Sequence, residues 1–513
     1  MWLRWCFVFS MCYSFACFSQ EQLTFTNPIV TIAIEQTPTS FNPLTDKGEM
    51  APQFKHLLFD PLFRWDKNHE IENRLVKSWK RINDKTIRFY LRKNVRFHSG
   101  NLLTSKDVIW SIEEAKKQPS NVFFNSLDKV TIIDRYTFDM TSRLSSIQLF
   151  DYLTAIFILD SSFYNKNHTL LTKAPTLISA SVKKLPVSGT GPYIVNQYNP
   201  LLGIELVSNS SYWDGYSNIK YFRFMQVNNA QSRLFALLSD DVQISYATPN
   251  ESIKDASENG MKRLLQVDSP NAVFLAINDK LTPALKNAKT RKALHLAIDQ
   301  EGMLKHILNG AGHVNASIIS LTEKQLPNQK MDVSVASPSY DLNKSKAMLK
   351  TLTLPKQLSL LVMLDEQIDM EKVALTIANM LKRIGIEVTI QKVTSKEVWN
   401  KTNLYYDLTL STWQTTLLSR DNVYDDLFIN SFLSDYLRDK SEQGAVTNSF
   451  NSKFEYFELL QQEDWIVPLF SQATIWAESG NYNLKDIFSS NGIPYWSLLK
   501  NEHQDKEVLY QSR

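Results

Sequence analysis

The hydrophobic pattern is clearest between residues 358 and 390, where it predicts two parallel strands of one sheet. Residues 358–364 form an almost continuous apolar run, which is typical of a buried strand. Residues 370–384 repeat apolar side chains at helical spacing, and Gly385 follows where a left-handed cap ends a helix. Residues 386–390 then alternate as a strand. A strand, a helix and a strand with short connections predict parallel pairing.

A further strand is predicted at residues 407–411, which lead into Trp413. In open parallel sheets, ligands bind beyond the carboxyl ends of the strands. The segment 411–416 is therefore a candidate binding site on this argument alone.

The first part of the chain also carries clear signals. Residues 29–34 and 86–91 have the spacing of strands. Thr104 is suited to cap a helix that begins at Ser105, with Asp107 placed to bind free backbone amides. Together with the later strands, these elements predict an α/β fold.

Length and charge limit the classes of protein. The chain has 513 residues, of which 43% are hydrophobic, so two or three domains are expected. Lys and Arg number 56 against 53 Asp and Glu, a formal net charge of +3. There is no basic block of the kind that nucleic-acid binding requires. Composition therefore argues for a globular protein that binds no nucleic acid.

Residues 1–19 have the pattern of an export signal. Arg4 supplies a positive charge, and residues 5–18 are apolar but too few to span a bilayer. Cleavage is expected after Ser19. A competing interpretation is lipid attachment at Cys17, which its neighbours fit less well.

All three cysteines lie in this segment, at positions 6, 12 and 17. The processed protein would have no thiol, which excludes structural disulfides, cysteine-ligated metal and a cysteine nucleophile. No later apolar run has the length of a membrane span.

Catalytic and metal-binding patterns are not found. His295 and His306 lie eleven residues apart on a helix predicted over residues 290–309, too far to share a metal. Residues 188–193 resemble a phosphate loop but lack its lysine, and a tight turn is expected there. The acidic pairs at 240–241 and 425–426 are expected to be surface charge. The sequence predicts no enzyme, no catalytic residue, no metal and no cofactor.

Several recognisable motifs stand in order between about residue 29 and about residue 470. They are Phe41-Asn-Pro43, Leu91-Arg-Lys-Asn-Val-Arg-Phe-His-Ser-Gly100 with Leu103-Thr-Ser-Lys-Asp-Val108, Ser188-Gly-Thr-Gly-Pro-Tyr193 with Asn209-Ser-Ser-Tyr-Trp213, Leu275-Ala-Ile-Asn278 with Thr290-Arg-Lys-Ala-Leu294 and Ala297-Ile-Asp299, Tyr340-Asp-Leu-Asn-Lys-Ser-Lys346, Asp407-Leu-Thr-Leu-Ser-Thr-Trp413 and Val467-Pro-Leu-Phe470. In this order they resemble one family, the extracellular solute-binding proteins of dipeptide and oligopeptide ABC importers (family 5), with the greatest similarity to the Sap type.

The resemblance implies a type II periplasmic binding protein fold, with two main lobes, an extra inserted domain and a cleft that closes by a hinge motion. The first lobe would comprise residues 20–45, 186–267 and 465–513. The second, inserted lobe would comprise residues 46–185, and the third residues 268–464.

The resemblance also implies which residues grip the ligand. They are Gln36 and Thr37 on the first lobe, and Ser411, Thr412, Trp413 and Thr416 on the third. Peptide-binding members usually have an aspartate where this chain has Thr416, and its charge meets the ammonium group of the peptide. A hydroxyl cannot make that charge-assisted bond. Asp421 and Asp425 follow in the next loop and are candidates to replace the charge.

The expected function is that of a periplasmic substrate-binding component, a monomer that carries peptides to an inner-membrane ABC permease. Two other interpretations stay open. One is binding of haem or another small solute on the same scaffold, although no histidine falls in the proposed cleft strands. The other is a hydrolase or a cytoplasmic sensory domain, against which the export signal argues.

Overall fold

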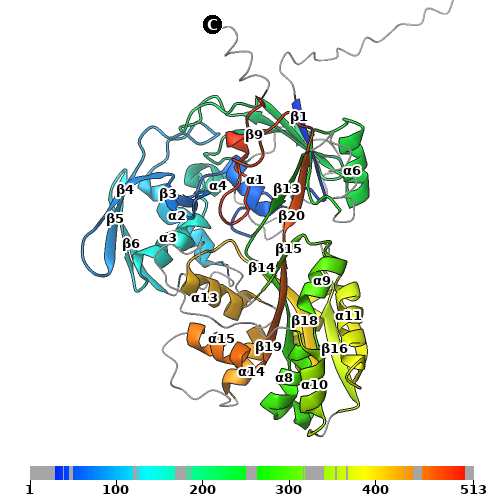
Figure 1. Cartoon of the computed structure of the whole chain (residues 1–513). Helices are drawn as coiled ribbons and strands as arrows, with labels where there is room; N and C mark the ends of the chain where they lie inside the picture. The colour runs from blue at the N-terminus through cyan, green and yellow to red at the C-terminus, as the bar shows by residue number, and fades with distance from the viewer. Residues whose placement is uncertain are drawn as a thin grey trace, which may run out of the picture.

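The computed structural model describes residues 29–38, 40–45, 50–118, 124, 126–167, 182–183, 187–249, 263–315, 317, 340–352, 355–365, 368–431, 434–442 and 453–502. The predicted export signal and the three cysteines lie outside these residues. Three larger sheets organise the described chain, each with its own helices and apolar core, and a two-stranded hairpin forms a fourth sheet (Figure 1).

The largest sheet has eight strands in the described chain, with β1 (Ile29–Ile34) near its centre. Side chains alternate across β1, so Ile32 packs against α1 (Ala51–Leu58) on one face while Ala33 packs against α6 (Ala230–Leu238) on the other. The order is β13 (Arg263–Val267), β20 (Thr474–Glu478), β12 (Ile244–Ser245), β1, β11 (Tyr221–Gln226), β10 (Gly203–Ser208), β9 (Tyr193–Asn199) and β8 (Val182–Lys183).

The second body is an antiparallel sheet of four described strands beside a short hairpin. The sheet order is β4 (Val76–Arg81), β5 (Thr86–Leu91), β7 (Thr137–Ser142) and β6 (Leu127–Asp134). The hairpin pairs β2 (Phe63–Trp65) with β3 (Ile71–Asn73). The helices are α2 (Ser105–Lys116), α3 (Ser146–Thr154) and α4 (Ser161–Lys166). The predicted cap of α2 is confirmed, because the Thr104 amide donates to the Asp107 carboxylate at 2.9 Å.

The third body contains a mixed sheet, in which six strands are described. Its order is β15 (Gly312–Val314), β19 (Ile466–Gln472), β14 (Asn271–Ile277), β18 (Leu408–Gln414), β16 (Gln357–Met363) and β17 (Glu387–Val393). The parallel pairing predicted for β16 and β17 is confirmed. Gly385 has φ +88°, the left-handed cap expected after the intervening helix.

Helices cover both faces of the six-stranded sheet (Figure 1). They are α8 (Ala288–Leu296), α9 (Gln300–Ile307), α10 (Leu342–Leu349), α11 (Met370–Lys382), α12 (Lys396–Thr402), α13 (Arg420–Asn430), α14 (Ser434–Glu442) and α15 (Lys453–Gln462). In the part of the chain that the structure describes, no helix is long and apolar enough to cross a bilayer.

Two expected boundaries are wrong. The single helix predicted over residues 290–309 is two helices, because Asp299 caps α9 by accepting from the Gly302 amide at 2.8 Å and so ends α8. In addition, β19 lies in the six-stranded sheet, whereas its residues were assigned to the first lobe together with the C-terminus.

The eight-stranded and six-stranded sheets are joined by a paired crossing. β13 pairs with β20 in one sheet, and β14 pairs with β19 in the other. The connections between them are short, residues 268–270 on one side and Ala473 on the other. Asn271 holds the crossing together, since its side chain donates to the Gln472 carbonyl at 2.8 Å and accepts from the Gln472 amide at 3.0 Å.

Candidate functional site

A small pocket lies where the three bodies meet. Its volume is about 60 Å³, room for a few water molecules and not for a peptide. Residues from all three bodies line it, including Lys55, His56, Arg64, Trp65, Thr416 and Tyr495. The three bodies are joined around this pocket, since Asp151 and Asn491 both hydrogen-bond with the third body, and this is the closed arrangement of the cleft.

Lys55 and His56 reach the pocket from the last turn of α1. The His56 ring lies between two aromatic rings, 4.9 Å from Phe157 and 4.9 Å from Tyr495 between centroids. Burial holds the pKa of His56 well below its usual value, and the neighbouring charges of Arg64, Arg74 and Lys55 lower it further. The imidazole is therefore neutral at pH 7 in a positively charged environment.

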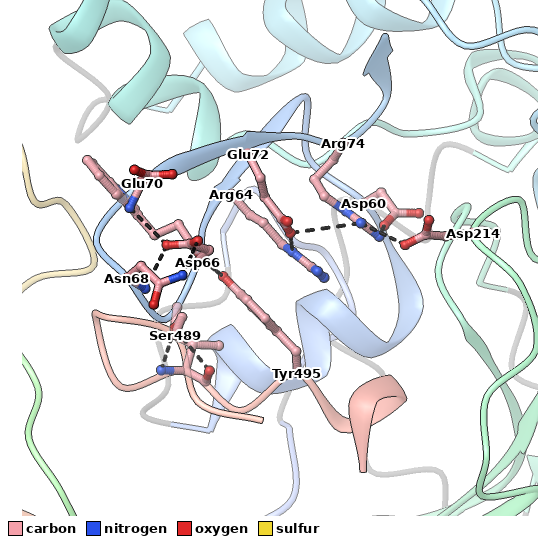
Figure 2. A network of polar contacts seen from close by, with 12 residues as sticks. Asp60, Arg64, Asp66, Asn68, Glu70, Glu72, Arg74, Asp214, Ser489 and Tyr495 are labelled. Carbon is pink, nitrogen blue, oxygen red and sulfur yellow. Dashed lines mark hydrogen bonds and ion pairs between the residues drawn. The ribbon is translucent and has the colours of Figure 1, made fainter. Parts of the chain in front are cut away.

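Arg64 enters the pocket from β2. Its guanidinium lies 4.2 Å from the centre of the Tyr495 ring, and its Nε pairs with the Glu72 carboxylate (Figure 2). Arg74, the residue after β3, is not among the residues that line the pocket. It pairs with Asp214 at 2.7 Å and with Asp60 at 3.5 Å.

Asp60 fixes the second body to the first. Its buried carboxylate accepts from Thr190 at 3.0 Å, Tyr212 at 3.0 Å and the Trp213 indole at 2.9 Å. These donors belong to the two motifs Ser188–Tyr193 and Asn209–Trp213. Both motifs therefore have a structural role. As expected for a turn, the segment 188–193 contains neither helix nor strand before Tyr193.

A buried carboxylate also fixes the second body to the third. Asp151 on α3 accepts four hydrogen bonds, from the Trp65 indole at 2.8 Å, the Leu418 amide at 3.1 Å, the Ser419 amide at 3.0 Å and the Asn422 side chain at 2.8 Å. The last three donors surround the first turn of α13, which lies beside α3 (Figure 1). Asp151 thus holds the second and third bodies together across the closed cleft, and we call this carboxylate with its four donors the latch.

We expect the latch to make closure depend on pH. Burial raises the pKa of Asp151 to about 6, although its four donors oppose the rise. In an open cleft the group would titrate near 4. Protonation therefore favours the closed arrangement, which gains about 1 kcal/mol as pH falls from 7.5 to 5. Small-angle scattering at several pH values measures this shift through the radius of gyration. In Asp151→Asn, which cannot titrate, the change in radius of gyration that protonation of Asp151 causes should vanish. An identical pH dependence in both proteins would contradict the prediction.

The structure separates the predicted ligand residues of the first lobe from the pocket. Thr37 is buried, and its hydroxyl donates to the Gln226 side chain at 2.9 Å and the Pro200 carbonyl at 3.1 Å. Gln36 is exposed. Neither residue lines the pocket, and the hydrogen bonds of Thr37 are those of a structural turn.

The predicted residues of the third body divide between two faces of a strand. β18 continues to Gln414, so Ser411, Thr412 and Trp413 lie within it and not beyond its end. Trp413 packs in the same apolar cluster as Trp65, a pocket residue. Thr412 points to the opposite face and donates to Asp365 at 3.1 Å.

Two polar atoms on the inner face of β18 lack a partner among the described residues. They are the Ser411 hydroxyl and the Trp413 indole nitrogen, and both are buried. Buried polar groups are usually hydrogen-bonded. Of the predicted residues, Ser411 and Trp413 thus retain unused hydrogen-bonding capacity.

Thr416 is the one predicted residue that lines the pocket directly. Its carbonyl accepts from the Asn491 side chain at 2.6 Å, a contact that brings the C-terminal segment against the third body. The candidate replacements for the missing aspartate face elsewhere. Asp421 accepts from Gln148 at 3.2 Å and Asp425 accepts from the Tyr152 hydroxyl at 3.4 Å, both on α3.

Sequence reasoning missed the pocket's basic side chains, Lys55, His56 and Arg64. A weak local signal exists, since Lys55 and His56 interrupt the apolar run of an eight-residue helix. The same pattern is common on solvated helices, so it does not single out a site.

The histidines give no metal site in the described part of the chain, where no three potential ligands cluster. His295 is buried, and its Nδ1 lies 2.5 Å from Asp464. His306 lies on α9, the helix beyond the break.

Comparisons with known proteins agree on one family. The model of "Bacterial extracellular solute-binding proteins, family 5 Middle" matches residues 70–433. The oligopeptide-binding protein AppA of Bacillus subtilis is 22% identical, over 73% of this chain and 72% of that protein. The nickel-binding protein NikA of Staphylococcus aureus is 23% identical, over 69% of each.

A solved structure shows the same fold. The periplasmic binding protein DppA of Helicobacter pylori, in complex with the peptide STSA, superposes with a TM-score of 0.71. It is 18% identical, and the match covers 93% of this chain and 98% of that one. The α/β binding-protein fold predicted from the motifs is confirmed. Since the family model spans most of the chain, this protein belongs to the bacterial extracellular solute-binding proteins of family 5.

Proposed function

We propose that the protein is the exported substrate-binding component of an ABC importer, that it binds peptides between its bodies and delivers them to a membrane permease, and that it catalyses no reaction. The observation that carries the proposal is the pocket at the junction of three bodies, lined by aromatic rings and a few polar groups. Sites of this composition hold a ligand by enclosure. Relatives named for oligopeptide and dipeptide binding share the family.

The proposed lobes follow the sheets. The first comprises residues 20–45 and 186–267 with the chain from Ala473 onward. The second comprises residues 46–185, although α1 within this range packs against the eight-stranded sheet. The third comprises residues 268–472, which moves the boundary to the paired crossing. Opening at this crossing would enlarge the pocket to admit a ligand, and closure would restore the Asp151 latch.

Once the cleft opens, the inner face of β18 supplies hydrogen bonds to a peptide. The Ser411 hydroxyl and the Trp413 indole have no partner among the described residues in the closed form. A peptide backbone offers acceptors and donors along its length, so it can satisfy both. Removal of the segment 1–19 in the periplasm and action as a monomer belong to the same proposal.

The direct test is native mass spectrometry of the chain expressed from Gln20 and purified without denaturation. We expect bound species of peptide mass, released by mild unfolding and identified by sequencing. A clean ligand-free mass, together with no thermal stabilisation by peptide pools, would contradict the proposal.

Haem is the second candidate, and one observation favours it. His56 lines the pocket, so the cleft does contain a histidine that could serve as an axial ligand. Purified protein mixed with one equivalent of haem would then develop a shifted absorbance band that His56→Ala removes. Absence of such a band at equal concentrations would eliminate this candidate.

A further inference from the structure

The strands β4 and β5 form a hairpin at the outer edge of the second body, at the left of Figure 1. Most of β4 and the turn after it are uncovered, since all nine residues from Lys77 to Lys85 are exposed. We call residues 77–85 the basic segment. Its side chains contribute little to an apolar core, so their chemistry has another explanation.

The basic segment carries a concentrated positive charge. It contains Lys77, Lys80, Arg81 and Lys85, and its one acid is Asp84. Four cations and one acid leave a net formal charge of +3, which equals the net charge of the whole 513-residue chain. The three lysines form no ion pair with the described residues. Their charge is therefore available to a partner.

The neighbouring side chains do not cancel this charge. Arg88, which lies opposite Lys80 on β5, binds the Asp139 carboxylate at two points, at 2.7 Å and 2.9 Å. Asp139 is thereby committed to Arg88. Arg81 donates to a backbone carbonyl at 3.0 Å and to the Ser146 hydroxyl at the start of α3. Neither bond involves a carboxylate, and the second holds β4 against α3.

Large apolar side chains are exposed among these cations. Trp79 is 42% exposed and Ile82 is 44% exposed. The indole of Trp79 is held in place, because its ring lies 4.9 Å from the Phe150 ring of α3 between centroids. Ile147, in the first turn of the same helix, is 42% exposed. The edge of β4 and the start of α3 thus present an indole and two isoleucines beside the cations.

The ordinary explanation of a charged edge strand does not cover this surface. In the described chain β4 is an edge of the four-stranded sheet, and lysines on an edge prevent pairing with another sheet. An exposed tryptophan and isoleucine on the same strand counteract that protection, because they add apolar surface. Cations together with aromatic and aliphatic side chains are instead typical of segments that lie at the interface between a membrane and water.

We propose that the basic segment, together with Ile147, docks on the surface of an anionic lipid bilayer. The lysines approach the negative headgroups, while Trp79, Ile82 and Ile147 enter the headgroup region. None of these residues lines the pocket, so the inference goes beyond the proposed function and requires no bound peptide. Under the proposed function, weak attachment of this kind would let the carrier search for its permease along a surface.

Co-sedimentation with lipid vesicles tests the proposal. The chain expressed from Gln20 is mixed, without added ligand, with vesicles of phosphatidylcholine alone or with about 40% phosphatidylglycerol. We expect at least tenfold more protein in the pellet with the anionic vesicles at about 20 mM salt. At about 300 mM salt the partition coefficient should fall at least fivefold, because salt screens charges at a surface.

Replacing the lysines tests the contribution of charge. The triple variant Lys77→Gln, Lys80→Gln and Lys85→Gln should reduce the partition coefficient at least tenfold, because each lysine near an anionic surface contributes about fivefold. The matched control replaces three exposed lysines of the third body by glutamine and should sediment like the wild-type protein. They are Lys286, Lys289 and Lys305.

Replacing Trp79 tests the contribution of the apolar side chains. Trp79→Ser should reduce the partition coefficient about fivefold and leave retention on a cation-exchange resin unchanged, because the ring interacts with lipid and not with charge. Its melting temperature shows whether the loss of the contact with Phe150 affects folding. The matched control is Tyr405→Ser, which removes another exposed ring and should sediment like the wild-type protein.

The outcomes decide between lipid and other partners. Equal sedimentation with neutral and anionic vesicles, or wild-type partition of the triple lysine variant, would overturn the proposal. Wild-type partition of Trp79→Ser would overturn the insertion of its ring. No sedimentation with either kind of vesicle would eliminate lipid and leave a protein as the partner of this surface. Peptide binding is measured separately, so the proposed function stands or falls on its own test.

Discussion

Replacing Asp151 by alanine is expected to open the cleft. The substitution removes the acceptor of four hydrogen bonds and leaves the Trp65 indole and two backbone amides of the α13 turn without a partner in the closed form. Unsatisfied buried donors cost about 1–3 kcal/mol each, and some regain water when the bodies separate. We expect the closed form to lose about 3–5 kcal/mol, comparable to breaking a buried ion pair.

Small-angle scattering should show the opening of the cleft as a larger radius of gyration. The first thermal unfolding transition should occur at a lower temperature than in the wild-type protein. Asp151→Asn should have a smaller effect, because its carbonyl oxygen can still serve the donors that now meet Oδ1. Asp128→Ala removes an exposed carboxylate in a surface pair, and it should change neither measurement. A compact Asp151→Ala protein with an unchanged melting profile would show that the latch does not hold the cleft closed.

The second large effect is expected at Gly189, where the backbone of residues 188–193 passes against the end of α1. A Cβ atom there would lie 2.0 Å from the Leu58 carbonyl oxygen and 2.5 Å from the Phe59 ring. The first neighbour is backbone and cannot rotate away. We expect Gly189→Ala to destabilise the protein by about 3–5 kcal/mol, because the loop of residues 188–193 must move away from the end of α1 to make room.

Thermal unfolding measures this as a fall of roughly 10 °C in the affected transition. The control is Gly215→Ala, where φ is +95° but no atom lies within 4 Å of the added Cβ. Gly215→Ala therefore loses stability only because alanine is less favourable than glycine at positive φ, about 1 kcal/mol. Equal melting temperatures for the two variants would contradict a role for close backbone approach at Gly189.

Local patterns predicted the local elements well. The parallel strands around α11, the left-handed Gly385 and the cap of α2 follow from spacing and from side-chain chemistry within a few residues. The break at Asp299 was missed, since an aspartate inside an apolar helical pattern is also compatible with a continuous helix. Trp413 was placed beyond its strand because its pairing with Ala272 depends on a segment 141 residues earlier.

The candidate site could not be derived in the same way. Asp151 meets its partners around α13 across more than 260 residues, and a charged residue near a helix end usually belongs to the surface. Lys55 and Arg64 become pocket residues only when Thr416 and Tyr495 arrive from distant parts of the chain. The recognisable motifs, in contrast, serve the joint around Asp60, so they identify the family without identifying the ligand.

The paired crossing between the two large sheets has a mechanical consequence. A two-stranded ribbon bends readily out of its plane, whereas bending within the plane would stretch one strand past the other and break their hydrogen bonds. Motion at residues 268–270 and Ala473 is thereby confined to one rotation axis, and each closure returns Thr416 to Asn491. Few backbone dihedrals change, so closing removes little conformational entropy. More of the contact free energy then remains to stabilise the closed complex, and this determines how long the ligand stays bound.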